Sequence, residues 1–383
     1  MLDHTRCLSL LLALFAASLP LRAAAAKGPP SPEGSRSPLP EGTTASAARH
    51  GIVLLDLVGL PADQAALERE APGAVVFAQA VSQGAAAGPS AASLLTSQYV
   101  QNHGLVVAGD RISTTAATMA DAFGGAGYAT AGFAADASLD PKSGVAQGFK
   151  TSDFKADSSS AAFQQATDAA VRWLAAQHGP FFLYWHGVRP AAESLEAFRA
   201  LRKAAPAGTV LVLTAGAGLG GGPELGERTV HVPLLIWSPD LKPRRVAEVV
   251  RLVDLGPALL EWAKITVPDS FQGASLAPLA EGRSATPRYG FSASGTAPGK
   301  PSLFSIRGEG WQMIYDKASG EARLFDLKAD PDMKTDLSES RPDIGLDLTQ
   351  RLMRHLRETK ASARRGGQLS PDLLRQMREK GYW

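Results

Sequence analysis

A small number of side chains in this sequence combine a reactive type with a position at which chemistry is expected. His186 ends a predicted buried strand at 181–185, and the carboxyl ends of such strands are where α/β sheets bind ligands. Ser90 comes directly after Pro89 at the start of a predicted helix, where the amide dipoles favour an anion. His103 lies within an Asn-His-Gly sequence. Imidazole and hydroxyl groups in such places suit metal ligation, proton transfer or nucleophilic attack.

Each of these residues also has a structural interpretation, which we favour. The hydroxyl of Ser90 would cap the helix that begins nearby, and His103 would be an internal hydrogen-bonding group. His186 would be a buried or rim histidine, although it is the strongest cleft candidate of the three. A lone imidazole without converging carboxylates is a poor metal site.

Charge and cysteine content exclude other kinds of site. The chain has 39 Lys and Arg against 37 Asp and Glu, a net charge of +2, which is too balanced for the basic surface of a nucleic-acid-binding protein. The single cysteine, Cys7, lies in a predicted targeting segment, so the processed chain would contain no thiol. Disulfides, thiolate metal sites and a cysteine nucleophile are therefore not expected.

The N-terminal residues have the pattern of a secretory signal peptide. Residues 1–26 contain Arg6, an apolar run from Leu8 to Leu19 and the small residues Ala23 to Ala26, in the order that precedes cleavage. A retained membrane anchor is disfavoured because the apolar run is shorter than the roughly 20 residues that span a bilayer. We expect an exported protein, periplasmic or secreted, with no integral membrane span after cleavage. Residues 27–49 are rich in Pro, Ser and Gly and are predicted to be a flexible leader.

The elements that must position the candidate residues alternate between strand and helix. A continuous apolar run at 52–55 is typical of a strand buried on both faces of a parallel sheet. From 50 to 282 the pattern predicts an α/β domain, with a mainly parallel central sheet flanked by helices. Further strands are expected at 75–77, 129–133, 181–185, 210–213 and 234–237, and helices at 113–125, 160–177 and 193–204.

The pattern changes over residues 283–383. Short strands separated by turn residues predict an antiparallel sheet, and helices follow it, so this region is expected to form a smaller α+β subdomain. The strands are predicted at 302–307, 311–315 and 321–327, and the helices at 342–360 and 370–380.

Residues 87–97 read AGPSAASLLTS, and Asn-His-Gly follows shortly after them. This stretch resembles the motif C/S-x-P-S-R-A-S-L-L-T-G, followed by H-G, of the sulfatase family of the alkaline-phosphatase-like superfamily, with this chain as a degenerate bacterial member. The resemblance covers residues 50–383 and implies an α/β fold. Further matches come in the family's order at Gly127 to Thr130, Gly148 to Phe149, Pro180 to His186, Thr209 to Gly218, Val232 to Ile236, Asp254 to Leu260, Gly273 to Leu279 and Leu324 to Pro331.

The resemblance implies a chemistry whose groups are replaced in this chain. Active members convert the motif Cys or Ser to a formylglycine whose hydrate attacks sulfur, and a divalent ion, usually calcium, is held by oxygen ligands beside it. The nucleophile position falls on Ala87 and the motif arginine on Ala91. The metal carboxylate of the first strand falls on Val58, and a metal Asp and its neighbouring His fall on Gly216 and Ala217. We therefore expect no catalytic residue, metal ligand or cofactor at these positions.

These observations predict an exported, catalytically inactive pseudo-sulfatase that keeps a cleft for an unknown ligand or an envelope protein. The alternative is an active sulfuric or phosphoric ester hydrolase with a rearranged metal set around Asp56, Asp63 or His186, which would require calcium. Asp56 could substitute for a ligand at Val58, because residues two apart share one side of an extended strand. A third hypothesis is a protein that regulates active sulfatases or takes part in envelope glycan handling.

Overall fold

Strand β1 (Ile52–Val58) lies inside the larger of two sheets, and all of its residues are buried. It pairs in parallel with β5 (Phe181–Val188) on one side and with β6 (Val210–Thr214) on the other. A strand covered on both faces and paired on both edges has no contact with water, which is why its sequence is an almost unbroken apolar run. One residue departs from that run, the carboxylate of Asp56.

The computed structural model describes residues 51–60, 64–70, 72–218 and 224–366, and all of these belong to one compact unit. The predicted signal peptide, the leader, the last helix at 370–380 and Asp63 lie outside the described residues. None of the described helices is both long and apolar enough to cross a membrane.

The larger sheet confirms the predicted α/β fold. Its strand order is β4-β3-β5-β1-β6-β8-β2-β7, with β9 pairing on β2. The pairs β3–β4, β3–β5 and β2–β9 are parallel, like those of β1, whereas β8 and β7 run antiparallel to their neighbours. The other strands of this sheet are β2 (Val75–Val81), β3 (Ala129–Ala135), β4 (Thr151–Lys155), β7 (His231–Val232), β8 (Leu234–Trp237) and β9 (Arg244–Arg251).

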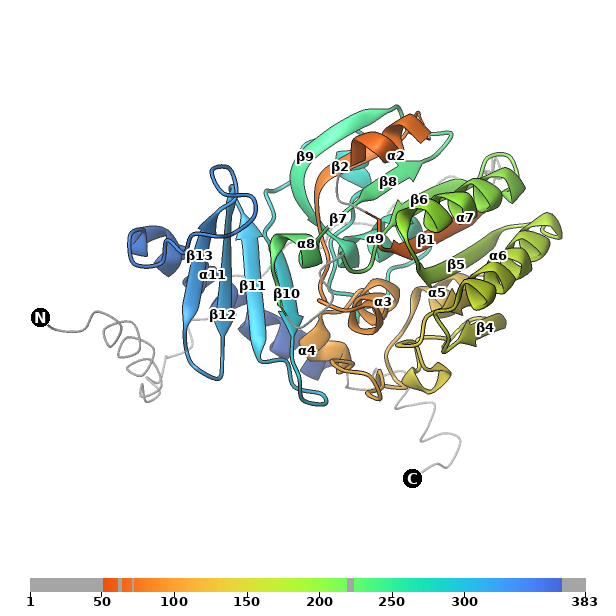
Figure 1. Cartoon of the computed structure of the whole chain (residues 1–383). Helices are drawn as coiled ribbons and strands as arrows, with labels where there is room; N and C mark the ends of the chain where they lie inside the picture. Colours follow the sequence, from red (N-terminus) through yellow and green to blue (C-terminus); the bar gives the residue numbers. More distant parts are fainter. Residues whose placement is uncertain (1–50, 61–63, 71, 219–223, 367–383) are drawn as a thin grey trace, which may run out of the picture. The chain divides into compact units, whose positions relative to one another are not determined.

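Helices cover both faces of the larger sheet. Successive residues of a strand point to opposite faces, so Leu54 and Leu55 of β1 belong to two different cores. The core around Leu55 contains α6 and α7, which lie side by side in Figure 1. The Leu54 face is covered by α3 (Ala87–Thr96), α5 (Met119–Gly125), α9 (Leu255–Trp262) and α10 (Ala277–Ala280), and the Leu55 face by α2 (Gln64–Glu70), α6 (Ser160–Ala175) and α7 (Ala191–Ala204).

Helix α5 is shorter than the predicted helix at 113–125, because it begins only at Met119. Thr118 and Asp121 form a capping box there. The Thr118 hydroxyl accepts a hydrogen bond from the Asp121 amide, and the Asp121 carboxylate accepts one from the Thr118 amide, each at 3.0 Å. These two bonds satisfy the Thr118 and Asp121 amides at the start of the helix, and so fix its first turn at Met119. The helices predicted at 160–177 and 193–204 are confirmed as α6 and α7.

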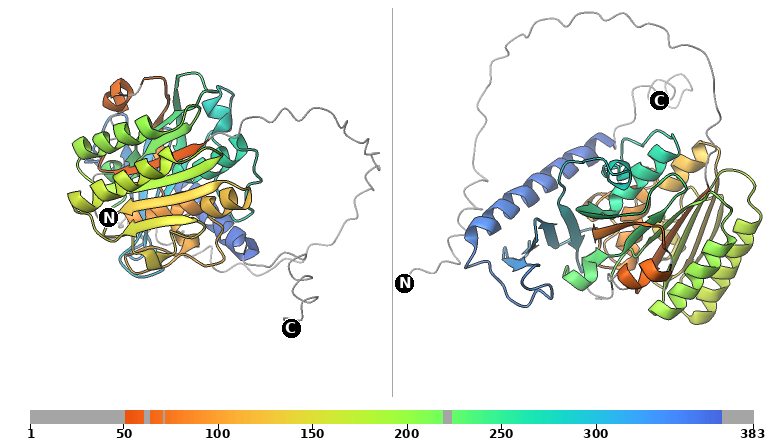
Figure 2. Two further views of the ribbon diagram at one scale, coloured as in Figure 1. Left: turned by 90° about the vertical axis from the view of Figure 1, so that its right-hand side faces the viewer. Right: turned by 90° about the horizontal axis from the view of Figure 1, so that it is seen from above.

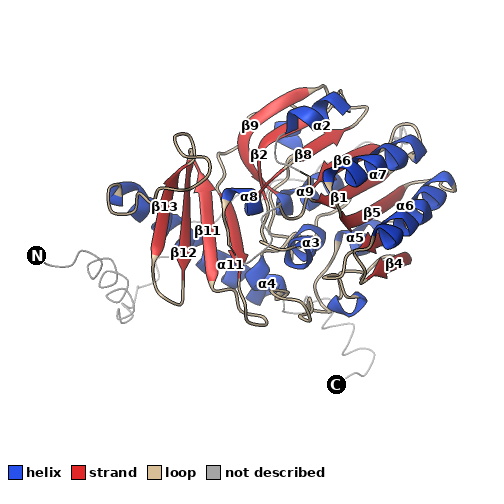
Figure 3. Cartoon of the chain, in the orientation of Figure 1, coloured by secondary structure: helices blue, strands red, loops and turns tan. Residues whose placement is uncertain are grey.

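A smaller antiparallel sheet follows in the chain, with the order β10-β11-β12-β13. Figure 3 shows it as a group of strands apart from the larger sheet. Its inner residues Phe304 and Met313 pack with Leu348 and Leu352 of the long helix α11, which runs along one side of the sheet in Figure 2. The bounds are β10 (Gly290–Ser294), β11 (Leu303–Gly308), β12 (Trp311–Asp316), β13 (Ala322–Asp326) and α11 (Pro342–Gly366), and the short helices are α4 (Val100–His103) and α8 (Glu227–Val230).

A fully buried carboxylate, Asp254, joins segments on the α3 side of the larger sheet. It accepts hydrogen bonds from Arg251 (Nη2 to Oδ1, 2.8 Å), from Arg288 (Nη1 to Oδ2, 3.1 Å) and from the Ala274 amide (2.8 Å). Arg251 also donates to the hydroxyl of Tyr99, at 3.0 Å. A buried ion is tolerated only when it is paired and hydrogen-bonded, so these groups depend on one another.

Replacing Asp254 with alanine should therefore be strongly destabilising, because it leaves two partly buried guanidinium groups without their counter-ion. We expect Asp254→Ala to lower the free energy of unfolding by about 3–5 kcal/mol in urea denaturation. Asp347→Ala, which removes an exposed partner of Arg351 on α11, is the matched control and should cost less than about 1 kcal/mol. Equal losses in the two variants would contradict the role of burial.

Candidate functional site

Polar side chains gather at the carboxyl ends of β1, β3 and β5, the edge at which parallel sheets bind ligands. The imidazole of His186 bridges two carboxylates: Nδ1 lies 2.9 Å from Oδ2 of Asp56, and Nε2 lies 3.0 Å from Oδ2 of Asp136. The Tyr184 hydroxyl donates to Oδ2 of Asp56 at 2.9 Å. Asp136 is 4% exposed and the other three are fully buried. We call these four residues the carboxylate–imidazole cluster.

The strand ladders fix this arrangement. Asp56 on β1 is the register partner of His186 on β5, and Ala134 on β3 is its partner on the other side. Asp136 is two residues beyond Ala134 and therefore faces the same side of the sheet. Tyr184 and His186 are also two apart, and both point to that side. Three of the four residues therefore lie on strands, and the fourth, Asp136, is the residue that directly follows β3.

Hydrogen bonding assigns the charges within the cluster. Each ring nitrogen of His186 faces a carboxylate oxygen, and because an ionised carboxylate accepts but cannot donate, this geometry favours a ring with a hydrogen on both nitrogens. Burial alone would lower the pKa of His186, but Asp56 and Asp136 outweigh it and raise the pKa to about 10. Burial opposes ionisation of Asp136 as well, yet its bonds with His186 and Ser138 hold the pKa of this carboxyl below its usual value. Burial, reinforced by Asp56, raises the pKa of Tyr184 well above its ordinary value, so the hydroxyl stays a donor.

The remaining oxygen of Asp56 is held by the backbone of Gly216, one of the positions at which the resemblance implies a metal ligand. The Gly216 amide donates to Oδ1 of Asp56, and its carbonyl accepts from the hydroxyl of Ser82. A Cβ atom at Gly216 would lie 2.9 Å from Oδ2 and 3.0 Å from Oδ1 of Asp56. Asp56 can rest against this backbone only because residue 216 has no side chain. The neighbouring Ala217 is buried, and Val58 ends β1 with 8% of its surface exposed.

The first residue of α3 is Ala87, where the resemblance implies the family nucleophile, and it is partly exposed. The preceding residue, Ala86, is the N-cap and makes no side-chain capping bond. The prediction that Ser90 caps this helix is wrong, because the helix begins before it and the Ser90 amide already donates to the Ala86 carbonyl. The Ser90 hydroxyl is buried and lies 3.0 Å from that of Ser82. Ala91 is fully buried in the core beneath α3.

His103 lies apart from the cluster, at the end of α4. Its Nδ1 accepts a hydrogen bond from the Leu105 amide at 3.1 Å, so its Nε2 carries the hydrogen and donates to the Ser93 hydroxyl at 2.8 Å. Burial lowers the pKa of His103 to about 3. The ring is therefore neutral and both nitrogens are occupied within the fold.

Asp136 and Tyr184 belong to the cluster but were not among the predicted site residues. Two signals pointed to them. Asp136 closely follows the strand predicted at 129–133, and Tyr184 alternates with His186 within the strand predicted at 181–185. What the pattern did not contain was the adjacency of β3 to β5, on which the contact between Asp136 and His186 depends.

The donor set does not fit calcium. Calcium needs several free oxygen ligands, whereas Asp56 is surrounded by hydrogens that point at it: the Gly216 amide, the Tyr184 hydroxyl and the His186 ring. Among the described residues, no group of three or more His, Cys, Asp or Glu side chains is arranged to hold a metal ion. We therefore derive no chemical step through a metal.

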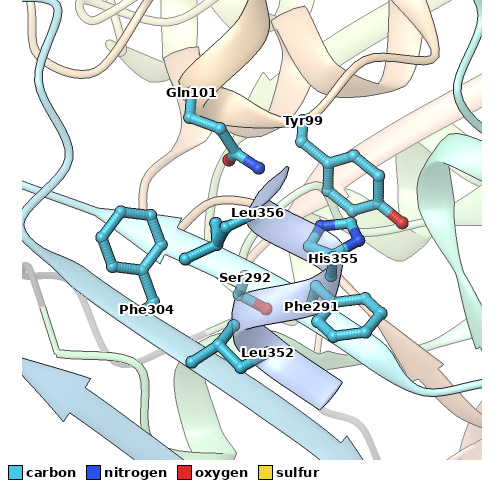
Figure 4. Close-up of a pocket in the computed structure, with 8 residues that line it drawn as sticks. All are labelled: Tyr99, Gln101, Phe291, Ser292, Phe304, Leu352, His355 and Leu356. Carbon is cyan, nitrogen blue, oxygen red and sulfur yellow. The ribbon is translucent and has the colours of Figure 1, made fainter. Parts of the chain in front are cut away.

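A separate pocket lies where α11 meets β10 and β11, and Figure 4 shows its lining. The ring of His355 stacks on Phe291, with centroids 3.7 Å apart, and meets Tyr99 edge-on. Burial, aided by Arg251, lowers the pKa of His355 to about 3, so this imidazole is neutral. The side chains around this pocket leave no room for a water molecule. Its lining residues are Tyr99, Gln101, Phe291, Ser292, Phe304, Leu352, His355 and Leu356.

The cluster predicts an alkaline limit to stability. The pKa of His186 is about 10 in the folded chain against an ordinary 6.5, so its contribution is fully present below about pH 6.5 and is lost as the pH rises to about 10. We expect the free energy of unfolding in urea to fall by a few kcal/mol, in order of magnitude, across that range. His103→Gln should keep this alkaline decline, because the lowered pKa of His103 affects stability only on the acid side of its ordinary value. A flat profile between pH 6.5 and 10 would contradict the assignment.

Two family models match the chain, one on each side of its middle. Residues 48–192 match the sulfatase model, and residues 225–362 match the C-terminal model of N-sulphoglucosamine sulphohydrolase. Arylsulfatase K of Mus musculus is 34% identical over 148 residues, which are 36% of this chain and 27% of that protein. An arylsulfatase of Clostridium perfringens is 34% identical over 119 residues, 30% of this chain and 24% of that protein. The matched stretch thus spans about a quarter of these relatives.

Solved structures agree over a longer stretch. A 2-O GAG sulfatase superposes with a TM-score of 0.69 and 16% identity, covering 82% of this chain and 94% of its own. A phosphonate monoester hydrolase of Agrobacterium radiobacter has the same TM-score and identity, with 82% and 96% covered. At such identities the likeness concerns the fold. The two family models, which between them match residues 48–192 and 225–362, show that the chain belongs to the sulfatase family.

Proposed function

We propose that this protein is an exported pseudo-sulfatase, which keeps the sulfatase fold and a cleft for a ligand or partner but does not hydrolyse sulfate esters. The observation that carries the proposal is the methyl group of Ala87 at the start of α3, where the family's reaction needs a residue that can become formylglycine. A methyl group can neither be converted to an aldehyde at this site nor attack sulfur.

The surroundings of Ala87 support the same proposal. The two nearby hydroxyls, Ser82 and Ser90, are buried and bonded to each other, so neither is presented to a substrate. A serine nucleophile needs a base to take its proton, and His186 cannot serve because both of its ring nitrogens already carry hydrogens toward carboxylates. Positions 91, 216 and 217 lack polar side chains.

The alternative of an active hydrolase with a rearranged metal set has one observation in its favour. Asp56 and His186, two of the residues it would use, lie in contact at the correct edge of the sheet. They face each other as donor and acceptor, however, and do not converge on a common point where an ion could be held. Metal content and turnover distinguish the two functions directly.

The first experiment measures turnover by the purified wild-type protein, together with its metal content by elemental analysis. The relatives named above suggest an aryl sulfate and an aryl phosphonate monoester as substrates, and the alternative of a phosphoric ester hydrolase adds an aryl phosphate. We expect no turnover above that of a mock purification, with or without added calcium. Near-stoichiometric metal together with catalytic turnover would refute the proposal and support the rearranged hydrolase.

The second experiment restores the nucleophile position alone. Ala87→Cys, produced together with a formylglycine-generating enzyme, should remain inactive towards the aryl sulfate because the arginine and metal positions stay empty at Ala91, Gly216 and Ala217. Ala86→Cys, at the exposed N-cap, is the matched control, and mass spectrometry of both variants reports whether either thiol is oxidised. Activity in Ala87→Cys alone would show that the metal ligands lie elsewhere.

A further inference from the structure

The burial of Asp56 creates an electrostatic requirement that something in the fold must meet. Its side chain is fully buried on β1, and an ionised carboxylate away from water is strongly unfavourable unless a positive charge or several hydrogen-bond donors face it. In active relatives the resemblance implies a divalent cation at this edge. Among the described residues, no three or more His, Cys, Asp or Glu side chains are arranged to hold one.

The only charged group in contact with Asp56 among the described residues is the ring of His186. The ring lies between Asp56 and Asp136, 2.9 Å from one carboxylate and 3.0 Å from the other. His186 on β5 thus joins Asp56 on β1 to Asp136, the residue that directly follows β3. Gly216 makes the arrangement possible, because a side chain there would occupy the space into which the Asp56 carboxylate has settled.

We propose that the imidazolium of His186 is a built-in counter-ion that stands in for the divalent cation of active relatives, and that it holds the carboxyl ends of β1, β3 and β5 together without metal. The inference rests on the proposed loss of metal-dependent hydrolysis and states how the remaining charge is balanced. The bridge to His186 gives the Asp56 carboxylate a role without metal. The side chains of Val58, Gly216 and Ala217, at the positions where the resemblance implies metal ligands, cannot bind an ion.

The first test asks whether the wild-type fold needs metal. Thermal unfolding of the purified full chain is measured after treatment with EDTA and again with millimolar calcium. A ligand that binds only the folded state raises the Tm. If His186 replaces the metal, calcium does not bind the folded chain, and we expect the Tm values in EDTA and in calcium to agree within about 1 °C. A Tm that falls in EDTA and is restored by calcium would overturn the proposal.

The second test observes the counter-ion itself. In protein labelled with ¹⁵N at histidine, both ring nitrogens of His186 should report attached hydrogens at pH 7, whereas His103 should report one, on Nε2. The His186→Gln and His103→Gln variants assign the signals by their loss. A neutral ring at position 186 would overturn the proposal, and this measurement on the wild-type protein decides it even where a variant does not fold.

The third test measures, through the Tm, the repulsion between the carboxylates of Asp56 and Asp136 when the imidazole between them is removed. His186→Gln leaves two carboxylates facing each other and should lower the Tm on the order of 10 °C. Adding Asp136→Asn removes one of these charges and should recover a large part of the loss. In the matched neutral pair, adding Ser93→Ala to His103→Gln should recover nothing, because no charge is left unpaired there. A double variant of the cluster that is less stable than His186→Gln alone would overturn the proposal.

These outcomes separate this inference from the proposed function. An inactive protein whose His186 ring is neutral would leave the pseudo-sulfatase proposal standing and remove the counter-ion. If the protein turns over an ester, its Tm is unchanged by EDTA and its His186 ring carries two hydrogens, the counter-ion would stand and the pseudo-sulfatase proposal would be refuted.

Discussion

A carboxylate that is taken out of water needs a positive partner, and Asp56 places this constraint on a strand paired on both edges and covered on both faces. The partner cannot approach through solvent, so it has to come from the neighbouring strands themselves. His186 on β5 and the backbone of Gly216, just after β6, meet Asp56 from either side. Asp136 then balances the far nitrogen of the imidazole. The carboxyl edge of the sheet is organised around this one charge.

The sulfatase fold and the sulfatase site have different physical requirements, so the proposed loss of the site would leave the fold intact. The fold depends on apolar strands and on helices that cover them, such as α3, whose residues Ala91 and Leu95 are fully buried. An alanine at position 91 packs into that core, whereas the arginine of the family motif would need space and a partner. Substitution of the site residues by small apolar ones is therefore compatible with an intact core.

The sequence predicted the central strands well because burial on both faces leaves short apolar runs, and helical stretches alternate with them along the chain. Strand β4 (Thr151–Lys155) escaped prediction because it lies at the sheet's edge and is largely polar, and β9 (Arg244–Arg251) escaped for a similar reason. The motif resemblance alone led to the prediction that alanine replaces the reactive groups at positions 87 and 91. The contact between His186 and Asp136 could not, because residue patterns do not state which strands are neighbours.

The cluster also has a consequence for the order of events in folding. Asp56 and His186 are 130 positions apart in the chain, and His186 and Asp136 are 50 apart. Contacts between such distant segments form late, after the loops between them have closed. Until β1, β3 and β5 have joined, each of the three charges remains hydrated, and the bridge contributes nothing. An interaction that is absent from the folding transition state changes the unfolding rate and leaves the folding rate almost unchanged. We therefore expect this bridge to slow unfolding of the sheet without changing how fast the sheet folds.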